Sequence, residues 1–338
     1  MDENLRQFIR KRKEDTVFLL KSNSRSEDVL DYPYRLLMML GLELERIIDL
    51  DDTKSTEKTI RFKNRGKRRL CLISSAHFLL SSNTIKKGSL KQSKWTDYKI
   101  HDFFSLLETI RILKPERFLW FPHDLLEPFK KEDLPFLSVA DCVFVPLNSM
   151  VSSIKSYIKN LKVAGWPRIH QDLDFSVKYE LVWFITYFQK IQEKMKPESF
   201  ANLVKPLIEY GVLFKFPGWT NTLPYEEAIQ KIGGKCINVK DTSLEIIAQT
   251  KIPIITAGSS LELEASLIKK PYIRFHFPLF IFKPPSEKTV ADCYNFYELT
   301  ESIENIKKNN FLNATDCIDY FNSNIFLQEA LKDYQDSN

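Results

Sequence analysis

The chain alternates short, strongly apolar runs with longer segments in which apolar residues recur every third or fourth position. Short continuous runs are typical of buried strands, and the longer spacing is typical of helices. In the first half, the runs predict strands at residues 16–20, 46–50, 69–74, 117–121, 140–146 and 161–164. Helices are predicted through residues 34–40 and 103–113, and the second ends before Pro115.

The second half repeats this alternation. Strands are expected at residues 181–186, 212–216, 235–239, 252–256 and 271–275, the last of which is expected to be the final strand. Helices are expected at 200–210, 226–232, 244–248 and 261–269, and from Phe296 onward. Strands that alternate with helices indicate parallel sheets covered on both faces. The pattern therefore predicts an α/β fold of two open sheets.

The length of the chain also favours two domains. Its 338 residues exceed the size at which single hydrophobic cores usually stop growing. We expect the first domain at residues 1–170 and the second at 171–300, joined near residues 165–180. The C-terminal helices at 301–338 are expected to pack back on the first domain. Residues 75–100 are polar and predict a long loop or an insertion.

Charge and cysteine usage limit the class of protein. The net charge of +5 arises largely from basic clusters at residues 6–13 and 63–69. These clusters are either solvated faces or surfaces for an anionic membrane, and no nucleic-acid-binding motif accompanies them. The five cysteines are dispersed, which indicates a reducing compartment and no zinc site. Without a signal peptide or an apolar span, a cytoplasmic protein is expected, with peripheral association at the inner face of a membrane left open.

The junction between the strand at 252–256 and the following helix carries a candidate anion site. Gly258, Ser259 and Ser260 form a small-residue turn, which leaves backbone N–H groups at a helix N-terminus where the macrodipole favours an anion. The alternative is ordinary capping, because Ser259 followed by Glu262 has the spacing of a capping box.

Four segments, in order, carry a resemblance to known enzymes. They are residues 114–124 (Lys-Pro-Glu-Arg-Phe-Leu-Trp-Phe-Pro-His-Asp), 140–146 (Ala-Asp-Cys-Val-Phe-Val-Pro), 163–168 (Val-Ala-Gly-Trp-Pro-Arg) and 256–273. The chain resembles GT-B-type glycosyltransferases, in the group that includes CDP-glycerol glycerophosphotransferases, bacterial surface-polysaccharide transferases and non-hydrolysing UDP-N-acetylglucosamine 2-epimerases. The resemblance implies two Rossmann-like domains facing each other across a cleft. It also implies a nucleotide-sugar donor and a surface-glycan or lipid-linked acceptor.

The resemblance assigns residues to the donor site. It implies that the turn of Gly258, Ser259 and Ser260 holds the donor phosphates and that Glu264 contacts the donor sugar or ribose. Arg168 could pair with a phosphate, and Lys215 could neutralise phosphate charge. Where relatives often have Lys-x-His-Pro, this chain has Phe in place of His after Lys215. The alternative interpretations involve no ligand: Glu264 would be an exposed residue of a helix, and Arg168 would be a surface residue of a linker.

The catalytic base is expected at the end of the strand at 117–121. Inverting transfer needs a carboxylate or an imidazole to take the proton of the acceptor hydroxyl. Asp124 or His123 is the candidate base, although Asp124 could instead cap a helix and His123 could be an ordinary loop residue. His77, at the end of the strand at 69–74, is a second candidate for the base. Other polar residues at strand ends are Ser22, Asn23, Arg25 and His276, the last of which could equally be a hydrogen-bonded core histidine.

Several classes of enzyme are disfavoured by absent motifs. The sequence has no Gly-x-Gly-x-x-Gly, no P-loop and no Gly-x-Ser-x-Gly. Neither a metal nor a cofactor is expected. The function expected is a metal-independent glycosyltransferase, with the donor sugar left open. The alternatives are a nucleotide-sugar epimerase on the same scaffold and a catalytically inactive binding subunit.

Overall fold

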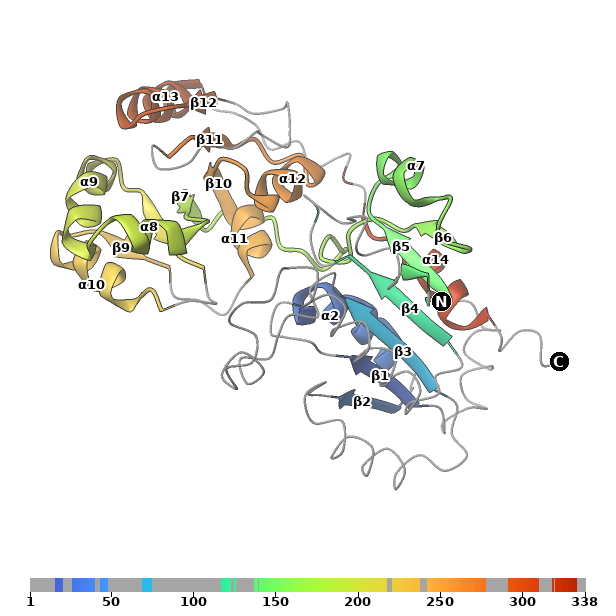
Figure 1. Ribbon diagram of the computed structural model, residues 1–338. Coiled ribbons are helices and arrows are strands. Elements are labelled where there is room, and N and C mark those ends of the chain that lie inside the picture. The colour runs from blue at the N-terminus through green and yellow to red at the C-terminus, as the bar shows by residue number, and fades with distance from the viewer. Residues whose placement is uncertain are drawn as a thin grey trace. The chain divides into compact units, whose positions relative to one another are not determined.

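The computed structural model describes residues 16–20, 26–39, 43–47, 69–74, 117–122, 125, 137–138, 140–217, 221–237, 242–277, 291–309, 318 and 320–332. The chain divides into two compact units, each built on one sheet (Figure 1). The first unit comprises Met1–His170 and Tyr320–Asn338, and the second comprises Gln171–Asp319. Every strand pair described is parallel, so the predicted α/β fold class is confirmed.

The first unit has a six-stranded sheet with the order β2-β1-β3-β4-β5-β6. Its strands are β1 (Thr16–Leu20), β2 (Glu43–Ile47), β3 (Arg69–Ser74), β4 (Arg117–Phe121), β5 (Cys142–Val145) and β6 (Leu161–Val163). Helix α2 (Ser26–Met39) follows β1 and contacts β3, and η2 (Asn148–Met150) and α7 (Val151–Ile154) connect β5 to β6. All residues of β4 and β5 are buried, as expected when both faces of a parallel sheet are covered.

The second unit has a six-stranded sheet with the order β12-β11-β10-β7-β8-β9. Its strands are β7 (Tyr179–Phe184), β8 (Leu213–Lys215), β9 (Lys235–Cys236), β10 (Thr250–Thr256), β11 (Ile273–Phe275) and β12 (Ala291–Cys293). The chain places β8 and β9 on one side of β7, then returns to place β10, β11 and β12 on the other side. This is the strand order of Rossmann dinucleotide-binding folds.

Six helices of the second unit are described, and they cover its sheet. They are α8 (Phe188–Lys194), α9 (Pro197–Glu209), α10 (Leu223–Lys231), α11 (Ser243–Gln249), α12 (Ser260–Leu267) and α13 (Phe296–Asn309). Helix α9 contacts α10 and α13, whereas α11 contacts α12, β7 and β10. Pro197 begins α9, where a missing N–H has no cost, and Thr242 and Glu245 form a capping box at α11.

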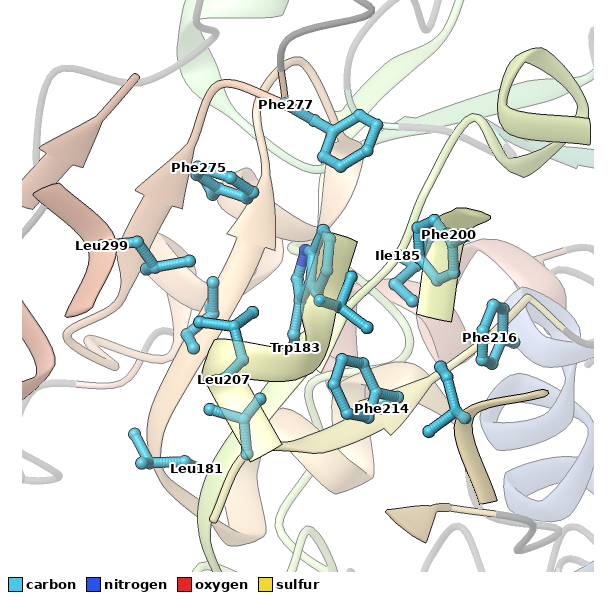
Figure 2. Close-up of a cluster of buried hydrophobic side chains, with 14 of the residues drawn as sticks. Leu181, Trp183, Ile185, Phe200, Leu207, Phe214, Phe216, Phe275, Phe277 and Leu299 are labelled. Carbon is cyan, nitrogen blue, oxygen red and sulfur yellow. The ribbon is translucent and has the colours of Figure 1, made fainter. Parts of the chain in front are cut away.

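The core of the second unit is rich in aromatic side chains. Figure 2 shows Trp183 of β7 surrounded by side chains of this cluster, including Phe214 and Phe275 from other strands and Phe200 from α9. The Trp183 ring lies 5.4 Å from Phe275, 6.1 Å from Phe214 and 6.2 Å from Phe200 between centroids. Because alternate β7 residues point to opposite faces and Val182 is also buried, both faces of the strand are covered.

The C-terminal segment of the chain packs on the first unit. Phe321 and Phe326 join Phe121 of β4 and Phe144 of β5 in an aromatic cluster with centroid separations between 4.7 and 6.4 Å. Phe326 lies on helix α14 (Ser323–Ala330), which contacts α2. Helix α13 instead contacts β11 and β12 of the second unit. The helices expected together at residues 301–338 are therefore divided between the two units.

Two elements of the second unit differ from the sequence prediction. The strand at 271–275 was expected to be the last, but β12 (Ala291–Cys293) pairs with β11 beyond it. The three residues of β12 are Ala-Asp-Cys, which form no apolar run and so give no strand signal. Helix α8 was also not predicted, because only Phe188 and Ile191 of its seven residues are apolar, which is too few to establish a helical period.

Candidate functional site

The turn between β10 and α12 lies where the strand order of the second unit reverses. Strands β7 and β10 are neighbours in the sheet, but the chain leaves β7 toward β8 and leaves β10 toward β11. In open α/β sheets, ligands bind outside the carboxyl ends of the strands at such a reversal. Residues 257–260 after β10 and residues 185–187 after β7 therefore form the candidate site.

Gly258 is held in position on two sides. Its φ of +81° lies in the left-handed region, which only glycine adopts without strain. Its N–H donates to Glu262 Oε1 at 2.7 Å, and its carbonyl oxygen accepts from the hydroxyl of Tyr187, which follows β7. The Ala257 N–H donates to the carbonyl oxygen of Phe275 in β11 at 2.9 Å. The turn is therefore fixed by residues from three different elements.

Ser259 is the N-cap of α12, and its Oγ accepts from the Leu261 N–H at 3.3 Å. The helix capping that the sequence offered as an alternative to an anion site is therefore present at the Ser259 hydroxyl. The capping box is not completed, because Glu262 accepts from Gly258 and not from Ser259. Among the residues that the structure describes, the N–H groups of Ser259 and Ser260 and the Ser260 hydroxyl have no hydrogen-bond partner. These donors at a helix N-terminus can bind an anion.

A buried polar network lies behind the turn. Glu262 is fully buried, and its Oε2 accepts from Arg274 Nε at 2.5 Å and from the Tyr272 hydroxyl at 3.2 Å. Arg274 Nη1 donates to both carboxylate oxygens of Asp292 at 3.1 Å. Asp292 Oδ1 in turn lies 2.9 Å from His276 Nε2. The network connects the turn to β11 and β12.

Burial and charge set the ionisation of this network. Burial raises the pKa of the Asp292 carboxyl, but the hydrogen bond from His276 and the positive charge of Arg274 outweigh it, so this pKa lies below its usual value. Burial lowers the pKa of the Arg274 guanidinium. The hydrogen bond and the negative charge of Glu262 outweigh this effect, so the pKa of Arg274 lies above its usual value. Arg274 and Asp292 are therefore both ionised near neutral pH, which fixes their mutual attraction.

Glu264 also lies on α12, about one turn beyond Ser260. Only 2% of its surface is exposed, so it is not the exposed helical glutamate of the alternative interpretation. Its predicted contact with a donor sugar or ribose stays a prediction.

Lys215 ends β8 at the same carboxyl edge of the sheet and is half-buried. Phe216, which stands where the resembled group often has His, is a core residue. Its ring packs edge-to-face on Phe188 at 5.1 Å and lies 6.2 Å from Phe200. The substitution replaces a polar group at this edge with a core side chain. The role of Lys215 toward phosphate stays a prediction.

Arg168 lies near the end of the first unit, in the segment at residues 163–168. Gly165 in this segment has a φ of +82°, and a Cβ added to it would lie 3.2 Å from the Cα of Phe321. The Asn322 N–H donates to the Ala164 carbonyl oxygen at 2.7 Å. The segment therefore holds the C-terminal segment against the first unit. Arg168 is half-buried, and its contact with phosphate stays a prediction.

The candidate base residues His123 and Asp124 lie outside the described residues, as do Ser22, Asn23, Arg25 and His77. Their roles therefore stay predictions. His276 is described: in addition to its contact with Asp292, its ring stacks on Tyr294 with centroids 4.3 Å apart.

Sequence reasoning missed two residues that follow β7. Tyr187 has a φ of 54° and donates to the Gly258 carbonyl oxygen, which joins the two strand ends at the reversal. Thr186 Oγ1 is buried and has no hydrogen-bond partner within the described residues. An aromatic residue in the left-handed region carries no sequence signal, so only the fold reveals these positions.

Neither a metal cluster nor a membrane span is found in the part of the chain that is described. No group of three or more His, Cys, Asp or Glu side chains there could hold a metal ion. No described helix is long and apolar enough to cross a membrane.

No protein-family model matches the sequence, and a search of curated proteins gives no match. Solved structures are similar to the chain in fold. A putative UDP-N-acetylglucosamine 2-epimerase from Listeria monocytogenes superposes with a TM-score of 0.51 and 11% identity, over 96% of this chain and 98% of that one. This likeness shows the fold alone. The chain has the two Rossmann-like units of the GT-B type that the resemblance implied.

Two further examples of similar structures have lower scores. The spinosyn rhamnosyltransferase SpnG has a TM-score of 0.48 at 8% identity, over 96% of this chain and 100% of that one. The wall teichoic acid polymerase TagF has a TM-score of 0.46 at 13% identity, over 98% of this chain and 87% of that one.

Proposed function

We propose that the protein is a glycosyltransferase that uses a nucleotide-activated sugar. One observation carries the proposal: the turn at residues 257–260 lies at the strand-order reversal of a Rossmann-like sheet, with the N–H groups of Ser259 and Ser260 unpaired within the described residues. A helix N-terminus in this position suits the phosphates of a nucleotide.

In this proposal, the N-terminus of α12 stabilises the leaving nucleotide. Negative charge accumulates on the phosphate oxygens as the bond to the sugar breaks. Preorganised N–H groups aimed at that charge lower the barrier because they need no rearrangement during the reaction. The Ser260 hydroxyl adds a further donor. The same groups can act without a metal ion, which is why the transfer is proposed to be metal-independent.

The remaining roles are assigned by the resemblance. Lys215 and Arg168 would add positive charge around the phosphates, and Glu264 would contact the donor sugar or ribose. Asp124 or His123 would accept the proton of the acceptor hydroxyl. The first unit would hold the acceptor, a surface glycan or a lipid-linked glycan, and the basic clusters near the N-terminus would favour an anionic membrane surface.

The proposal is tested with a panel of nucleotides and nucleotide sugars. The panel includes UDP-N-acetylglucosamine, because the epimerase with the similar fold is named after this nucleotide sugar. We expect at least one member to raise the melting temperature, and its sugar to be transferred with release of the nucleotide in the presence of EDTA. Conversion of the donor to its epimer would favour the epimerase. Stabilisation without turnover of any donor and acceptor would favour an inactive binding subunit.

A matched pair of variants locates the site. Ser260 and Ser243 are the first residues of α12 and α11, each directly after an N-cap. Asp at the first turn of a helix is favourable for the helix but repels a bound phosphate. We expect Ser260→Asp to weaken nucleotide binding strongly and Ser243→Asp to leave it unchanged, with both proteins folded. Equal affinity of the two variants would place the nucleotide elsewhere.

A further inference from the structure

Helices α11 and α12 begin with the same pattern but are capped differently. Glu245 follows the N-cap Thr242 by three residues, and Glu262 follows the N-cap Ser259 by three. In α11, Glu245 Oε2 accepts the N–H of Thr242 itself at 2.6 Å, which completes the capping box. In α12, Glu262 Oε1 accepts the N–H of Gly258, one residue earlier. The N–H of Ser259 therefore lacks the partner that its counterpart in α11 has.

The position of the Glu262 carboxylate is set from the interior of the unit. Its second oxygen is held by Tyr272 and Arg274, and the exposed fractions of the Glu262 and Arg274 side chains are 0% and 3%. A carboxylate at a helix N-terminus would by itself repel an anionic ligand. The guanidinium of Arg274 offsets that charge. Glu262 can therefore hold the turn without opposing a phosphate.

We propose that Glu262 is a positioning residue for the nucleotide site. By accepting the N–H of Gly258, it fixes the turn and leaves the N–H groups of Ser259 and Ser260 for the donor phosphates. Tyr187 holds the carbonyl oxygen of Gly258 from the end of β7, so the turn cannot rotate to complete an ordinary capping box. This inference rests on the proposed function, because it concerns the same site.

Two double variants isolate the hydrogen bond to Gly258. Glu262→Gln/Arg274→Met keeps an acceptor for the Gly258 N–H, whereas Glu262→Met/Arg274→Met removes it. Both remove the buried Glu262–Arg274 charge pair as a unit, and such replacements often preserve the fold. Asp292 loses the Arg274 guanidinium equally in both proteins, keeps its contact with His276 and has a side chain that is 37% exposed. The two proteins then differ in the acceptor at residue 262, which serves the Gly258 N–H and the Tyr272 hydroxyl.

The readout is the Kd for the nucleoside diphosphate that the wild-type protein binds most tightly among UDP, dTDP, CDP, GDP and ADP, measured by calorimetry. We expect the Gln-containing variant to bind within about twofold of wild type and the Met/Met variant about tenfold more weakly, as the loss of one hydrogen bond implies. Exchange of the amide hydrogens at residues 257–261 should be faster in the Met/Met variant. Glu245→Met, in the completed capping box of α11, should leave the Kd unchanged.

Equal affinity of the two double variants would overturn the positioning role, even if both melt at a lower temperature than wild type. That result would identify Glu262 as a purely structural residue and leave the nucleotide site intact. A wild-type protein that binds neither any of the five nucleotides nor CMP would overturn the proposed function, and this inference with it.

Discussion

Lys270 is a buried cation in the second unit. Only 5% of its surface is exposed, and its Nζ donates to the carbonyl oxygen of Ala248 at 3.1 Å. Ala248 lies in the last turn of α11, where carbonyl oxygens lack partners within the helix and the dipole favours a positive charge. Burial lowers the pKa of the Lys270 ammonium to about 8. Lys270, which follows α12, is therefore hydrogen-bonded to α11, but burying its positive charge is unfavourable.

This pKa predicts how stability depends on pH. Below pH 8 the folded and unfolded chains both carry the proton at Lys270. Between about pH 8 and 10.5 only the unfolded chain does, so the free energy of unfolding should rise with pH across this window, by on the order of 3 kcal/mol. Urea denaturation of wild type and Lys270→Met at pH 7.5 and 9.5 measures the effect. The stability of the wild type relative to the variant should increase; a difference that is constant with pH would contradict the assignment.

At the residue scale, the sequence predicted which residues form the turn but not how they are held. The spacing of Ser259 and Glu262 indicated a capping box, and the small residues indicated an anion site. The shift of the Glu262 carboxylate to Gly258 depends on Arg274, which lies on the next strand of the sheet. The contribution of Tyr187 depends on the pairing of β7 with β10. Contacts made by tertiary pairing leave no signal in a local pattern.

At the element scale, α14 is anchored to the first unit by a buried ion pair. Arg117 Nη2 lies 3.1 Å from Glu329 Oε2, and Asn160 Nδ2 donates to the same oxygen at 2.8 Å. Lys162 Nζ lies 3.2 Å from Glu329 Oε1. Burial raises the pKa of the Glu329 carboxyl, but the hydrogen bonds of Asn160 and Lys162 outweigh it, and the pKa lies below its ordinary value. The carboxylate is therefore charged at neutral pH and ties the helix to β4.

Breaking this pair should destabilise the first unit. Glu329→Met leaves the Arg117 side chain, 11% exposed, without this counter-charge, and we expect a loss of about 3 kcal/mol in the free energy of unfolding. Lys162→Met is the matched control: the Lys162 side chain is 42% exposed, so its pair with Glu329 should contribute less than about 1 kcal/mol. Urea denaturation compares the two. Similar, small losses in both would contradict the anchoring role.

The elements that the sequence predicted best are those with long apolar runs. Strand β10 was expected at residues 252–256 and spans Thr250–Thr256, because its run of apolar residues is continuous and buried. Strand β2 was expected at 46–50 but spans Glu43–Ile47, since its pairing register with β1 decides which residues join the sheet. The three residues of strand β12 form no apolar run that would predict a strand. Short edge elements depend on their neighbours more than on their own residues.

At the scale of the whole molecule, alternation of strands and helices predicted two parallel sheets, and the resemblance predicted their Rossmann-like kind. Alternation alone could not give the order of strands, because the same series of elements is compatible with more than one arrangement. The order places the turn at residues 257–260 at the reversal between β7 and β10. This placement, and not the sequence of the turn, is what distinguishes a candidate nucleotide site from ordinary helix capping.

The central claim is that the N-terminus of α12 binds the phosphates of a nucleotide. A crystal structure of the wild-type protein soaked with UDP, CDP or CMP tests it most directly. We expect phosphate oxygens within hydrogen-bond distance of the N–H groups of Ser259 and Ser260. Phosphates of a bound nucleotide that lie elsewhere on the protein would contradict it.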